Sequence, residues 1–448
     1  MENTRSGYNG NSANTGGSRA NFRRGNNSAA VNARSRTAGT VMSAGTAVPA
    51  AAPHKPAIKL DRRAEKQKKK EKRKSVIDFS IPQKFDFSFF LIVIVLMAFG
   101  LVMLFSSTYP TANNTRGDTY FFIIHQLGYT AVGLAAMIGI SFIDYHFFMT
   151  KFIVRVGSAA AITLMVLVKF IGQTTNGSER WIEIFGIRFQ PSEVLKLMTI
   201  IVIASYMQKN FDKLGSFVHG YIPVMLRIGV ACALVAVQPH LSATLIILII
   251  SIALLFIGGA KLPHVLITLA GVAVAGVLVF EVFPKLGFDY VTDRLLSFRD
   301  PEADIQDKTY QTYQSLIAFG SGGFFGQGLG NSHQKYSYLP FTENDFIFSI
   351  IVEELGFVGA VVIILLFIIL VVRGFYIAAS APDRFGMLLC AGIVIQIGVQ
   401  AFLNIAVASN AFFNTGVSLP FFSYGGTALL MQLAEMGIVL NISRKASI

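Results

Sequence analysis

Blocks of apolar residues, each about 17 to 25 residues long, recur from residue 85 to the end of the chain. An α-helix of this length can cross a lipid bilayer, and polar or glycine-rich stretches separate the blocks. The predicted fold class is therefore an all-α polytopic membrane protein. We expect ten transmembrane helices, at about 85–106, 120–142, 152–171, 191–207, 221–237, 240–257, 262–283, 345–371, 384–408 and 423–442.

Basic residues between these spans predict the orientation of the chain. If alternate loops are placed inside, the inner loops hold Lys151, Arg155, Lys209, Lys213, Lys261, Arg373, Arg384, Arg444 and Lys445. This agrees with the positive-inside rule and places both termini in the cytoplasm. Two sizeable segments then face outwards, residues 172–190 and a long loop at 284–344 between the seventh and eighth spans. Long loops are often functional, and we expect part of this one to pack back against the helices.

The first 84 residues have a different composition from the rest. They hold 18 Lys and Arg and 5 Asp and Glu, while the rest of the chain holds 20 of each, so the net charge of +13 belongs to this tail. This distribution does not indicate a nucleic-acid partner. Residues 1–54 are rich in Asn, Ser, Gly and Ala and predict disorder. The basic run at 55–74 favours the anionic lipids of the cytoplasmic leaflet, or only fixes topology. We predict a cytoplasmic tail, 1–84, and a membrane domain, 85–448.

Three acidic residues mark the start of the eighth span. Asp345 is expected at its outer mouth, where it could simply cap the helix. Glu353 and Glu354 follow about two turns later and point about 100° apart. Charge inside a membrane is costly, so each acid is a candidate functional residue, although a structural cation could be its partner.

Cationic candidates precede the fourth span. Arg180 and Arg188 lie in the first outer segment beside Trp181, the single tryptophan. Topology does not require outer arginines, and a guanidinium group matches the geometry of phosphate and diphosphate. Within "QPSEVLK", Glu193 and Lys196 are three residues apart on one helical face, where they could also form only an internal ion pair.

Other motifs predict structure rather than chemistry. The glycine-rich "GSGGFFGQGLGN", residues 320–331, lacks the pattern of a nucleotide loop, and its glycines permit tight turns between helices. His240 in "QPHLSAT" is interpreted as a structural histidine with satisfied hydrogen bonds. Cys232 and Cys390 lie in apolar segments and show no disulfide or metal-ligand spacing.

Three stretches together carry a family resemblance. They are "SERWIEIFGIRFQPSEVLKL", "YQSLIAFGSGGFFGQGLGNSHQKYSYLPFTENDFIFSIIVEELGFVGA" and "NTGVSLPFFSYGGTALLMQLAEMGIVLNISR". In order and spacing, residues 85–448 resemble the SEDS family (shape, elongation, division and sporulation). One departure is "QPHLSAT", residues 238–244, where the family often has an acid and a glycine.

The resemblance implies a peptidoglycan glycosyltransferase that polymerises lipid II, a disaccharide-pentapeptide on undecaprenyl diphosphate, at the outer face of the cytoplasmic membrane. Its implied partners are a class B penicillin-binding protein and other membrane proteins of the division or elongation machinery. Asp345 falls on the essential acid and is the implied base, and Arg180, Arg188 and Lys196 fall on cationic positions. Further candidates for substrate contact within the matching stretches are Trp181, Glu193, Lys335, Glu353, Glu354 and Ser423.

The chemistry agrees with these residue types. Glycosyl transfer from a lipid diphosphate needs a base for the acceptor hydroxyl and cations for the leaving group. No nucleotide cofactor is required; Mg²⁺ or Mn²⁺ could assist, although the sequence shows no metal-ligand cluster. Among family roles, division is favoured because long cytoplasmic tails are commoner there, while elongation and sporulation stay open. Two other functions stay open as well: a lipid II flippase, and a non-enzymatic scaffold that recruits a penicillin-binding protein.

Overall fold

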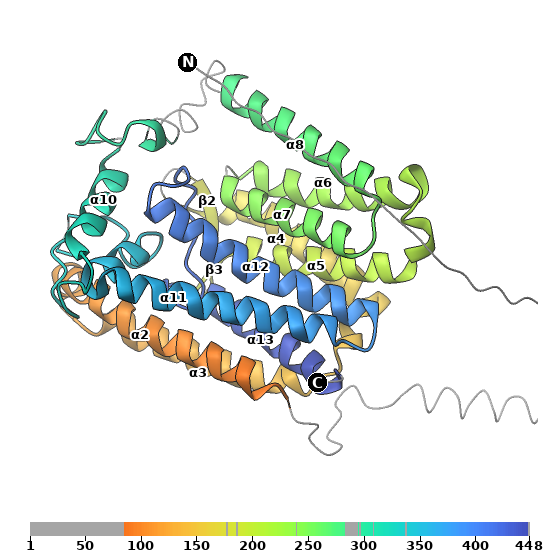
Figure 1. Ribbon diagram of the computed structural model, residues 1–448, viewed down its shortest axis with the longest axis horizontal. Coiled ribbons are helices and arrows are strands. Elements are labelled where there is room, and N and C mark those ends of the chain that lie inside the picture. Colours follow the sequence, from red (N-terminus) through yellow and green to blue (C-terminus); the bar gives the residue numbers. More distant parts are fainter. Residues whose placement is uncertain are drawn as a thin grey trace, which may run out of the picture. The chain divides into compact units, whose positions relative to one another are not determined.

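The computed structural model describes a helical membrane domain (Figure 1). The residues described are 85–175, 178–184, 187–238, 240–282, 294, 297–307, 309–336 and 338–446. The predicted tail, 1–84, lies outside them. The helices are α2 (Phe87–Arg116), α3 (Phe121–Ser141), α4 (Ser158–Ile171), α5 (Pro191–Lys209), α6 (Ile222–Ala236), α7 (Leu241–Ile257), α8 (Leu262–Val282), α10 (Tyr310–Gly322), α11 (Ile347–Ala379), α12 (Arg384–Ala408) and α13 (Gly426–Lys445).

Each of the ten expected spans coincides with a helix, and the all-α polytopic membrane fold is confirmed, while the number of helices that cross the membrane stays a prediction. Among the described residues, seven helical stretches are long and apolar enough to cross a membrane: Phe87–Asn114, Phe121–Ser141, Ile153–Ile171, Phe217–Ala236, Ile347–Ala379, Arg384–Ala408 and Gly426–Lys445. Shorter apolar stretches are Leu241–Ile257, which is α7, and Leu262–Leu278 within α8. Helix α5 is more polar, and most of its residues are buried inside the protein, where its charged side chains can find partners.

Helices α12 and α13 form the centre of the bundle. In the most apolar stretch of each helix, 72% of the residues of α12 and 78% of those of α13 are buried inside the protein. The corresponding share is 17% for the stretch that contains α4. Helix α13 packs along α3, and α12 contacts α5, α7 and α11. Helix α8 lies at the edge of the bundle beside α7 (Figure 1). The central helices therefore offer the positions at which polar side chains can be kept away from lipid.

Local sequence signals explain where several helices begin. The carboxylate of Asp86 accepts a hydrogen bond from the backbone N–H of Phe89 at 2.9 Å and caps α2. Asp383 caps α12 in the same way through the N–H of Gly386, at 2.7 Å. Pro191 occupies the first turn of α5, as its fixed φ and missing N–H predict.

A small antiparallel sheet occupies the first outer segment, which the all-helical prediction left as a loop. Its strands are β1 (Gln173–Thr175), β2 (Ser178–Ile184) and β3 (Ile187–Phe189), in the order β1-β2-β3. Glu183 on β2 lies opposite Arg188 on β3. Strand β2 contacts α4 and α5, and β3 contacts α13, so the sheet is fixed to the central helices.

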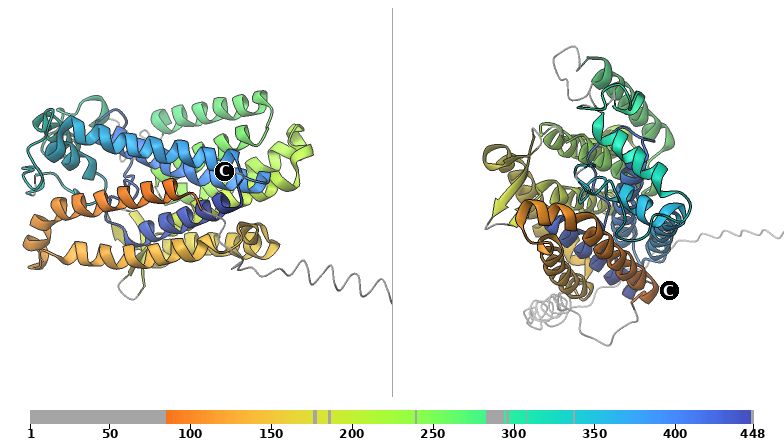
Figure 2. Two further views of the ribbon diagram at one scale, coloured as in Figure 1. Left: turned by 60° about the horizontal axis from the view of Figure 1, so that its bottom comes forward. Right: turned by 90° about the vertical axis from the view of Figure 1, so that its left-hand side faces the viewer.

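The glycine-rich loop crosses a break in α11, as its glycines predict. Gly356 interrupts α11 with a φ of 69°. At the break, Gln327 and Gly328 donate backbone hydrogen bonds to the carbonyl groups of Glu353 and Glu354, each at 3.0 Å. The loop thus satisfies helix carbonyls that lipid could not satisfy. Helix α10 also packs against α11, so this part of the long outer loop returns to the bundle, near the N-terminal end of α11 (Figure 2).

Candidate functional site

A cavity of about 370 Å³ opens among the ends of several helices near the start of α11. Its walls come from the small sheet, from the first turns of α3, α5, α7 and α13, from Gln400 on α12, and from the segments just before α11 and α13. The polar and charged residues in these walls are Arg116, His125, Tyr129, Arg180, Trp181, Glu183, Arg188, Gln190, Glu193, Lys196, His240, Ser242, Asn344, Asp345, Gln400, Ser418, Ser423, Tyr424 and Gln432.

This lining brings together seven of the ten candidate residues found in the sequence. Asp345, Arg180, Arg188, Lys196, Glu193, Trp181 and Ser423 all face the same cavity. They come from segments up to about 240 positions apart, so only the folded bundle makes them neighbours. An acid and several cations around one enclosed space suit the transfer of a group that leaves as an anion.

Asp345 lies two residues before α11 begins, and its backbone is held by α12. The side-chain amide of Asn404 donates hydrogen bonds to the carbonyl oxygen of Asp345 at 2.8 Å and to that of Val417 at 2.7 Å. Asn404 is fully buried. The residue that caps α11 is Phe346, whose side chain makes no capping bond, so the alternative of Asp345 as the helix cap is not what the structure shows.

The surroundings of Asp345 favour its protonated form more than water does. Burial raises the pKa of Asp345 above its ordinary value, while the charges of Arg294 and Arg180 act in the opposite direction. Gly416 leaves the carboxylate room, because a Cβ at that position would lie 3.3 Å from Asp345 Oδ2. A carboxylate with a raised pKa is a stronger base than an exposed one.

The two cationic arginines project from the sheet. Arg180 lies on β2 and Arg188 on β3, and the hydroxyl of Thr427 on α13 donates a hydrogen bond to the carbonyl oxygen of Arg188 at 3.0 Å. Regular strand geometry fixes the backbone from which each arginine side chain extends, and the bond to α13 holds that of Arg188 in addition. Trp181 lies between the two arginines in sequence and faces the cavity as well.

Lys196 and Glu193 form the ion pair that their spacing predicts. The Lys196 Nζ atom lies 2.8 Å from Glu193 Oε2, and both side chains are buried against the cavity wall. The pair is compatible both with an internal ion pair and with a substrate-binding cation, since Lys196 faces the cavity while it neutralises Glu193. Ser423 is already engaged: it donates to the carbonyl oxygen of Asn344 at 2.6 Å and accepts from the N–H of Leu419 at 2.8 Å. Its hydroxyl therefore fixes the segment next to Asp345.

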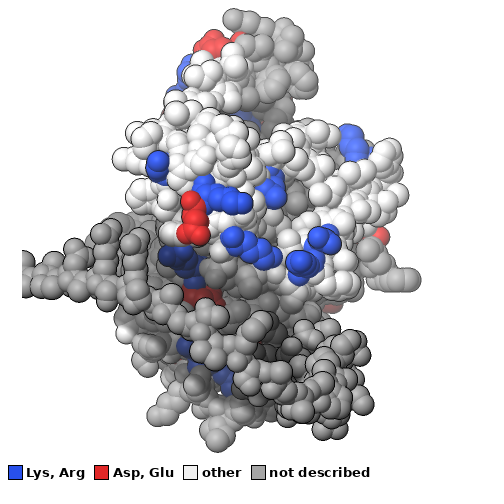
Figure 3. Space-filling model, turned by 90° about the vertical axis from the view of Figure 1, so that its right-hand side faces the viewer, with Lys and Arg blue, Asp and Glu red and all other residues white. Residues whose placement is uncertain are grey.

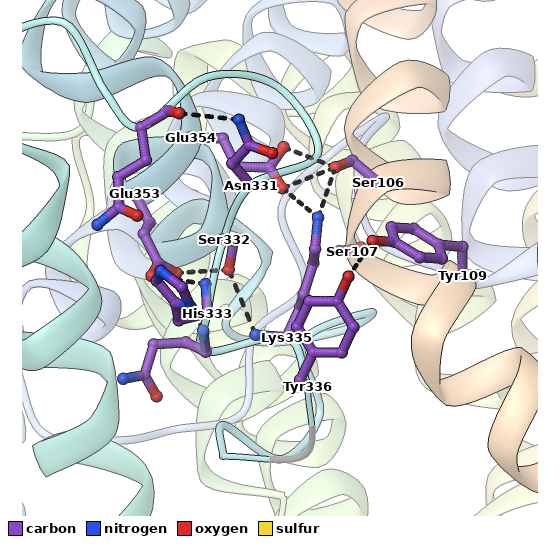
Figure 4. Close-up of polar contacts among 12 residues, drawn as sticks. Ser106, Ser107, Tyr109, Asn331, Ser332, His333, Lys335, Tyr336, Glu353 and Glu354 are labelled. Atoms are coloured by element: carbon purple, nitrogen blue, oxygen red, sulfur yellow. Dashed lines mark hydrogen bonds and ion pairs between the residues drawn. The ribbon is translucent and has the colours of Figure 1, made fainter.

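Glu353, Glu354 and Lys335 do not line this cavity, contrary to the expectation that groups them with it. They lie in a second cluster, drawn in Figure 4. Lys335 Nζ is 2.7 Å from Glu354 Oε1, and both side chains are fully buried. Ser106 on α2 donates to Glu354 at 2.6 Å, and Glu353 accepts from Ser332 and from the N–H of His333 at 3.0 Å. These acids tie α2, the glycine-rich loop and α11 together, so we assign them to structure.

His240 also differs from its interpretation as a satisfied structural residue. Its side chain is 6% exposed and lines the cavity, yet its Nδ1 atom has no hydrogen-bond partner among the residues that the structure describes. The sequence alone offered no sign of this, since hydrogen-bond satisfaction depends on distant segments.

Arg294 and Asn404 are the main residues that sequence reasoning missed. The guanidinium of Arg294 donates to the carbonyl oxygen of Asn414, and its charge acts on Asp345. Arg294 is an outer-loop arginine, so the argument used for Arg180 and Arg188 would have found it. Asn404 could have been flagged as a polar residue inside an apolar span.

Comparisons with known proteins find relatives that span most of this chain. Residues 86–448 match the family model FtsW/RodA/SpoVE, described as cell cycle protein. A probable peptidoglycan glycosyltransferase FtsW of Geobacter sp. (strain M18) is 38% identical over 361 residues, which cover 81% of this chain and 97% of the relative. The stage V sporulation protein E of Bacillus subtilis (strain 168) is 35% identical over 360 residues, covering 80% of this chain and 97% of that protein.

Solved structures show the same fold. A chain from a peptidoglycan synthase complex that coordinates polymerization and crosslinking aligns with a TM-score of 0.66 at 25% identity, over 80% of this chain and 98% of that one. The rod shape determining protein RodA of Thermus thermophilus aligns with a TM-score of 0.58 at 24% identity, over 81% of this chain and 98% of that one.

We predict that Lys335→Met is strongly destabilising, because it leaves the buried carboxylate of Glu354 without its cation. The expected loss is about 3–5 kcal/mol. The double variant Lys335→Met/Glu354→Gln removes both charges, keeps a partner for Ser106, and should regain most of that loss. The measurement is thermal unfolding of the purified full chain in detergent.

Lys445→Met is the matched control, since Lys445 pairs with Asp144 at 2.7 Å but both side chains are partly exposed. An exposed pair contributes about 1 kcal/mol or less. A Lys335→Met variant as stable as Lys445→Met, or a double variant no more stable than the single one, would contradict the structural assignment.

Proposed function

Because this chain belongs to the FtsW/RodA/SpoVE family of cell cycle proteins, we propose that it is a peptidoglycan glycosyltransferase that polymerises lipid II. The observation that supports this most directly is the single cavity in which Asp345 lies with Arg180, Arg188 and Lys196. The relatives named as glycosyltransferases favour this function over a lipid II flippase or a scaffold.

Asp345 is the general base in the proposed reaction. Its carboxylate takes the proton from the acceptor sugar hydroxyl as that oxygen forms a bond to the anomeric carbon of the donor. The bond between the anomeric carbon and the lipid diphosphate breaks, and the diphosphate leaves with its electron pair. Asn404 keeps the base in place by holding the backbone on both sides of the cavity, at Asp345 and at Val417.

The cationic side chains stabilise the leaving diphosphate. Arg180 and Arg188 can each offer two parallel N–H donors to phosphate oxygens, and Lys196 adds a buried charge. Among the described residues, no group of three or more His, Cys, Asp or Glu side chains could hold a metal ion. The protein cations are therefore proposed as the main partners of the diphosphate. Participation of a Mg²⁺ or Mn²⁺ ion stays a prediction, and such an ion would be bound largely by the substrate.

The proposed orientation places the cavity at the outer face of the cytoplasmic membrane. Helix α11 separates Asp345 from Arg373 by about 40 Å at 1.5 Å per residue. At the Arg373 end, Arg373 pairs with Asp86 at 2.8 Å, and the N–H of Asp86 binds the hydroxyl of Ser443 at 3.1 Å. The chain thus enters α2 and leaves α13 on the side opposite to the cavity. Lys and Arg side chains are prominent on the face in Figure 3, which supports a cytoplasmic assignment of that end.

A penicillin-binding protein is the proposed partner. The solved relative comes from a complex that couples polymerization to crosslinking, and glycan strands made here would need a second enzyme to crosslink them. The proposed role is cell division, which the FtsW relatives at 35% to 38% identity support. The anionic-lipid interaction of the basic tail stays a prediction, because the tail lies outside the described residues.

We predict that Asp345→Asn lowers glycan polymerisation by about a hundredfold or more, because the amide cannot accept the acceptor proton. Asp345→Glu should also be poor, since a shift of about 1 Å in a catalytic group is costly. In the wild type, turnover should fall as the pH is lowered through the raised pKa of Asp345, since only the ionised form is a base. The measurement is chain formation from labelled lipid II by purified protein with its partner and without an energy source.

Glu343→Gln is the matched control for Asp345→Asn. Glu343 lies two residues earlier in the same segment, and it does not line the cavity. This variant should keep turnover within a few-fold of the wild type. If Asp345→Asn were as active as Glu343→Gln at equal thermal stability, Asp345 would not be the base. A wild type that transports lipid II without polymerising it would instead favour the flippase.

We predict that Arg180→Ala and Arg188→Ala each weaken lipid II turnover more than the corresponding lysine variants. Lysine retains the charge but loses the two-donor geometry. Arg299→Ala, which removes an exposed arginine of the long outer segment, should have little effect. Steady-state kinetics with labelled lipid II would show the difference. Wild-type activity for both alanine variants would rule out a role in diphosphate binding.

A division role predicts enrichment of a fluorescently tagged copy at the septum of dividing cells, measured by microscopy. The Asp345→Asn variant should localise in the same way, because its fold and its partner contact are intact. Uniform distribution along the sidewall would favour elongation, and appearance only in sporulating cells would favour sporulation.

A further inference from the structure

His240 is a buried polar residue of the cavity that the mechanism above does not use. Its side chain is 6% exposed, and Nδ1 has no hydrogen-bond partner among the described residues. A buried donor or acceptor without a partner costs about 1–3 kcal/mol. Native proteins retain few such groups, and the His240 ring lines the substrate cavity, so a turn of the ring about its Cβ–Cγ bond would bring Nδ1 to a partner supplied by the ligand.

The backbone around His240 is fixed from both sides. His240 is the residue that precedes α7. Before it, the amide of Gln238 donates to the carbonyl oxygen of Met165 on α4 at 2.7 Å. After it, the hydroxyl of Ser242 donates to the carbonyl oxygen of Thr415, in the segment that leads to α13. These two anchors hold the imidazole in the cavity wall before any ligand arrives.

Burial lowers the pKa of His240 well below its ordinary value, and nearby positive charges lower it further, so the neutral imidazole is favoured. The charged groups that act on it most are the cations Arg180, Lys196 and Arg294, which oppose a further positive charge. A neutral imidazole carries one N–H, and the hydrogen bond available to the ring decides which nitrogen carries it. An anion next to Nδ1 would select the form with the proton on Nδ1.

The same surroundings favour an anionic ligand. Three arginines line the cavity, and Glu193 is already paired with Lys196. The remaining acidic side chains of the lining, Glu183 and Asp345, are fewer than the arginines. A diphosphate in this cavity would have more oxygen lone pairs than the cations can satisfy, and a neutral donor can serve one of them.

We propose that His240 is a substrate-binding residue whose ring turns toward the bound substrate, so that its Nδ1–H donates a hydrogen bond to a phosphate oxygen of the lipid-linked diphosphate. This inference rests on the proposed function, because that function supplies the diphosphate. No proton is transferred: the neutral ring only donates, while the arginines and Lys196 supply the charge. His240 thereby adds recognition of the diphosphate without adding to the repulsion among the cations.

The test is binding of undecaprenyl diphosphate to the purified full chain in detergent, with undecaprenol as the probe that lacks phosphate. His240→Phe keeps a buried ring without a donor, and it should weaken diphosphate binding by about tenfold or more, as expected for a hydrogen bond to a charged group. His240→Asn places an N–H close to the position of Nδ1 and should bind within about threefold of the wild type. Binding of undecaprenol should be equal in all variants.

His264→Phe is the matched control, because His264 also has a buried Nδ1 atom without a partner in the described part of the chain but does not line the cavity. It should bind the diphosphate lipid like the wild type. His240→Gln keeps the proposal testable if His240→Phe unfolds, since its longer amide reaches the position of Nε2 and should not restore binding. Two results would overturn the proposal. One is equal affinity of the wild type and His240→Phe for undecaprenyl diphosphate, and the other is an equal loss of affinity for undecaprenyl diphosphate and for undecaprenol in that variant.

Polymerisation of lipid II by the wild type, measured in the same preparation, separates the two claims. Suppose that the wild type forms no glycan, but the His240→Phe variant binds the diphosphate more weakly than the wild type does. The proposed function then fails and the binding role of His240 stands. If the wild type forms glycan and His240→Phe binds the diphosphate normally, the role of His240 fails alone.

Discussion

The absence of hydrogen-bonding solvent in a bilayer is the constraint on which this structure depends. A charged side chain or a free carbonyl group inside the bundle has to find its partner in another segment of the same chain. The ion pair of Lys335 with Glu354 meets this requirement, as do the loop bonds that cover the break in α11 at Gly356. Each of these contacts joins segments that are distant in sequence, so satisfying the polar groups also fixes how the helices are arranged.

The same constraint divides the buried charges into two groups with different roles. In the cluster around Glu353 and Glu354, carboxylate oxygens accept from hydroxyl groups, backbone N–H groups and a lysine, which leaves little capacity for a ligand. In the cavity, Asp345 instead faces open space, and His240 keeps an unpartnered nitrogen. The charges of the second cluster satisfy one another and hold the bundle together, whereas Asp345 and His240 keep capacity for a substrate. This difference explains why acids only eight residues apart on one chain segment serve different purposes.

Rigid supports around the cavity complement this division. Asn404 holds Asp345 from α12, Ser423 holds the neighbouring Asn344, and Thr427 holds Arg188. The proposed base and the proposed cationic partners are therefore placed by central helices, whereas the sheet that carries the arginines would be too small to be stable alone. Positioning by buried hydrogen bonds is what a transfer reaction needs, because small displacements of catalytic groups are costly.

By itself, the sequence determined the helical membrane fold, the approximate helix bounds, the Glu193–Lys196 pair and seven of the residues that line the cavity. It could do so because hydropathy runs, proline position and helical spacing act over short distances. Local patterns could also have indicated β2, since "SERWIEI" alternates polar and apolar residues as strands do. Only the tertiary structure decided that Glu353, Glu354 and Lys335 pair away from Asp345, that Asn404 holds Asp345, and that His240 lacks a partner. Those facts depend on which distant segments meet, and a local pattern carries no information about that.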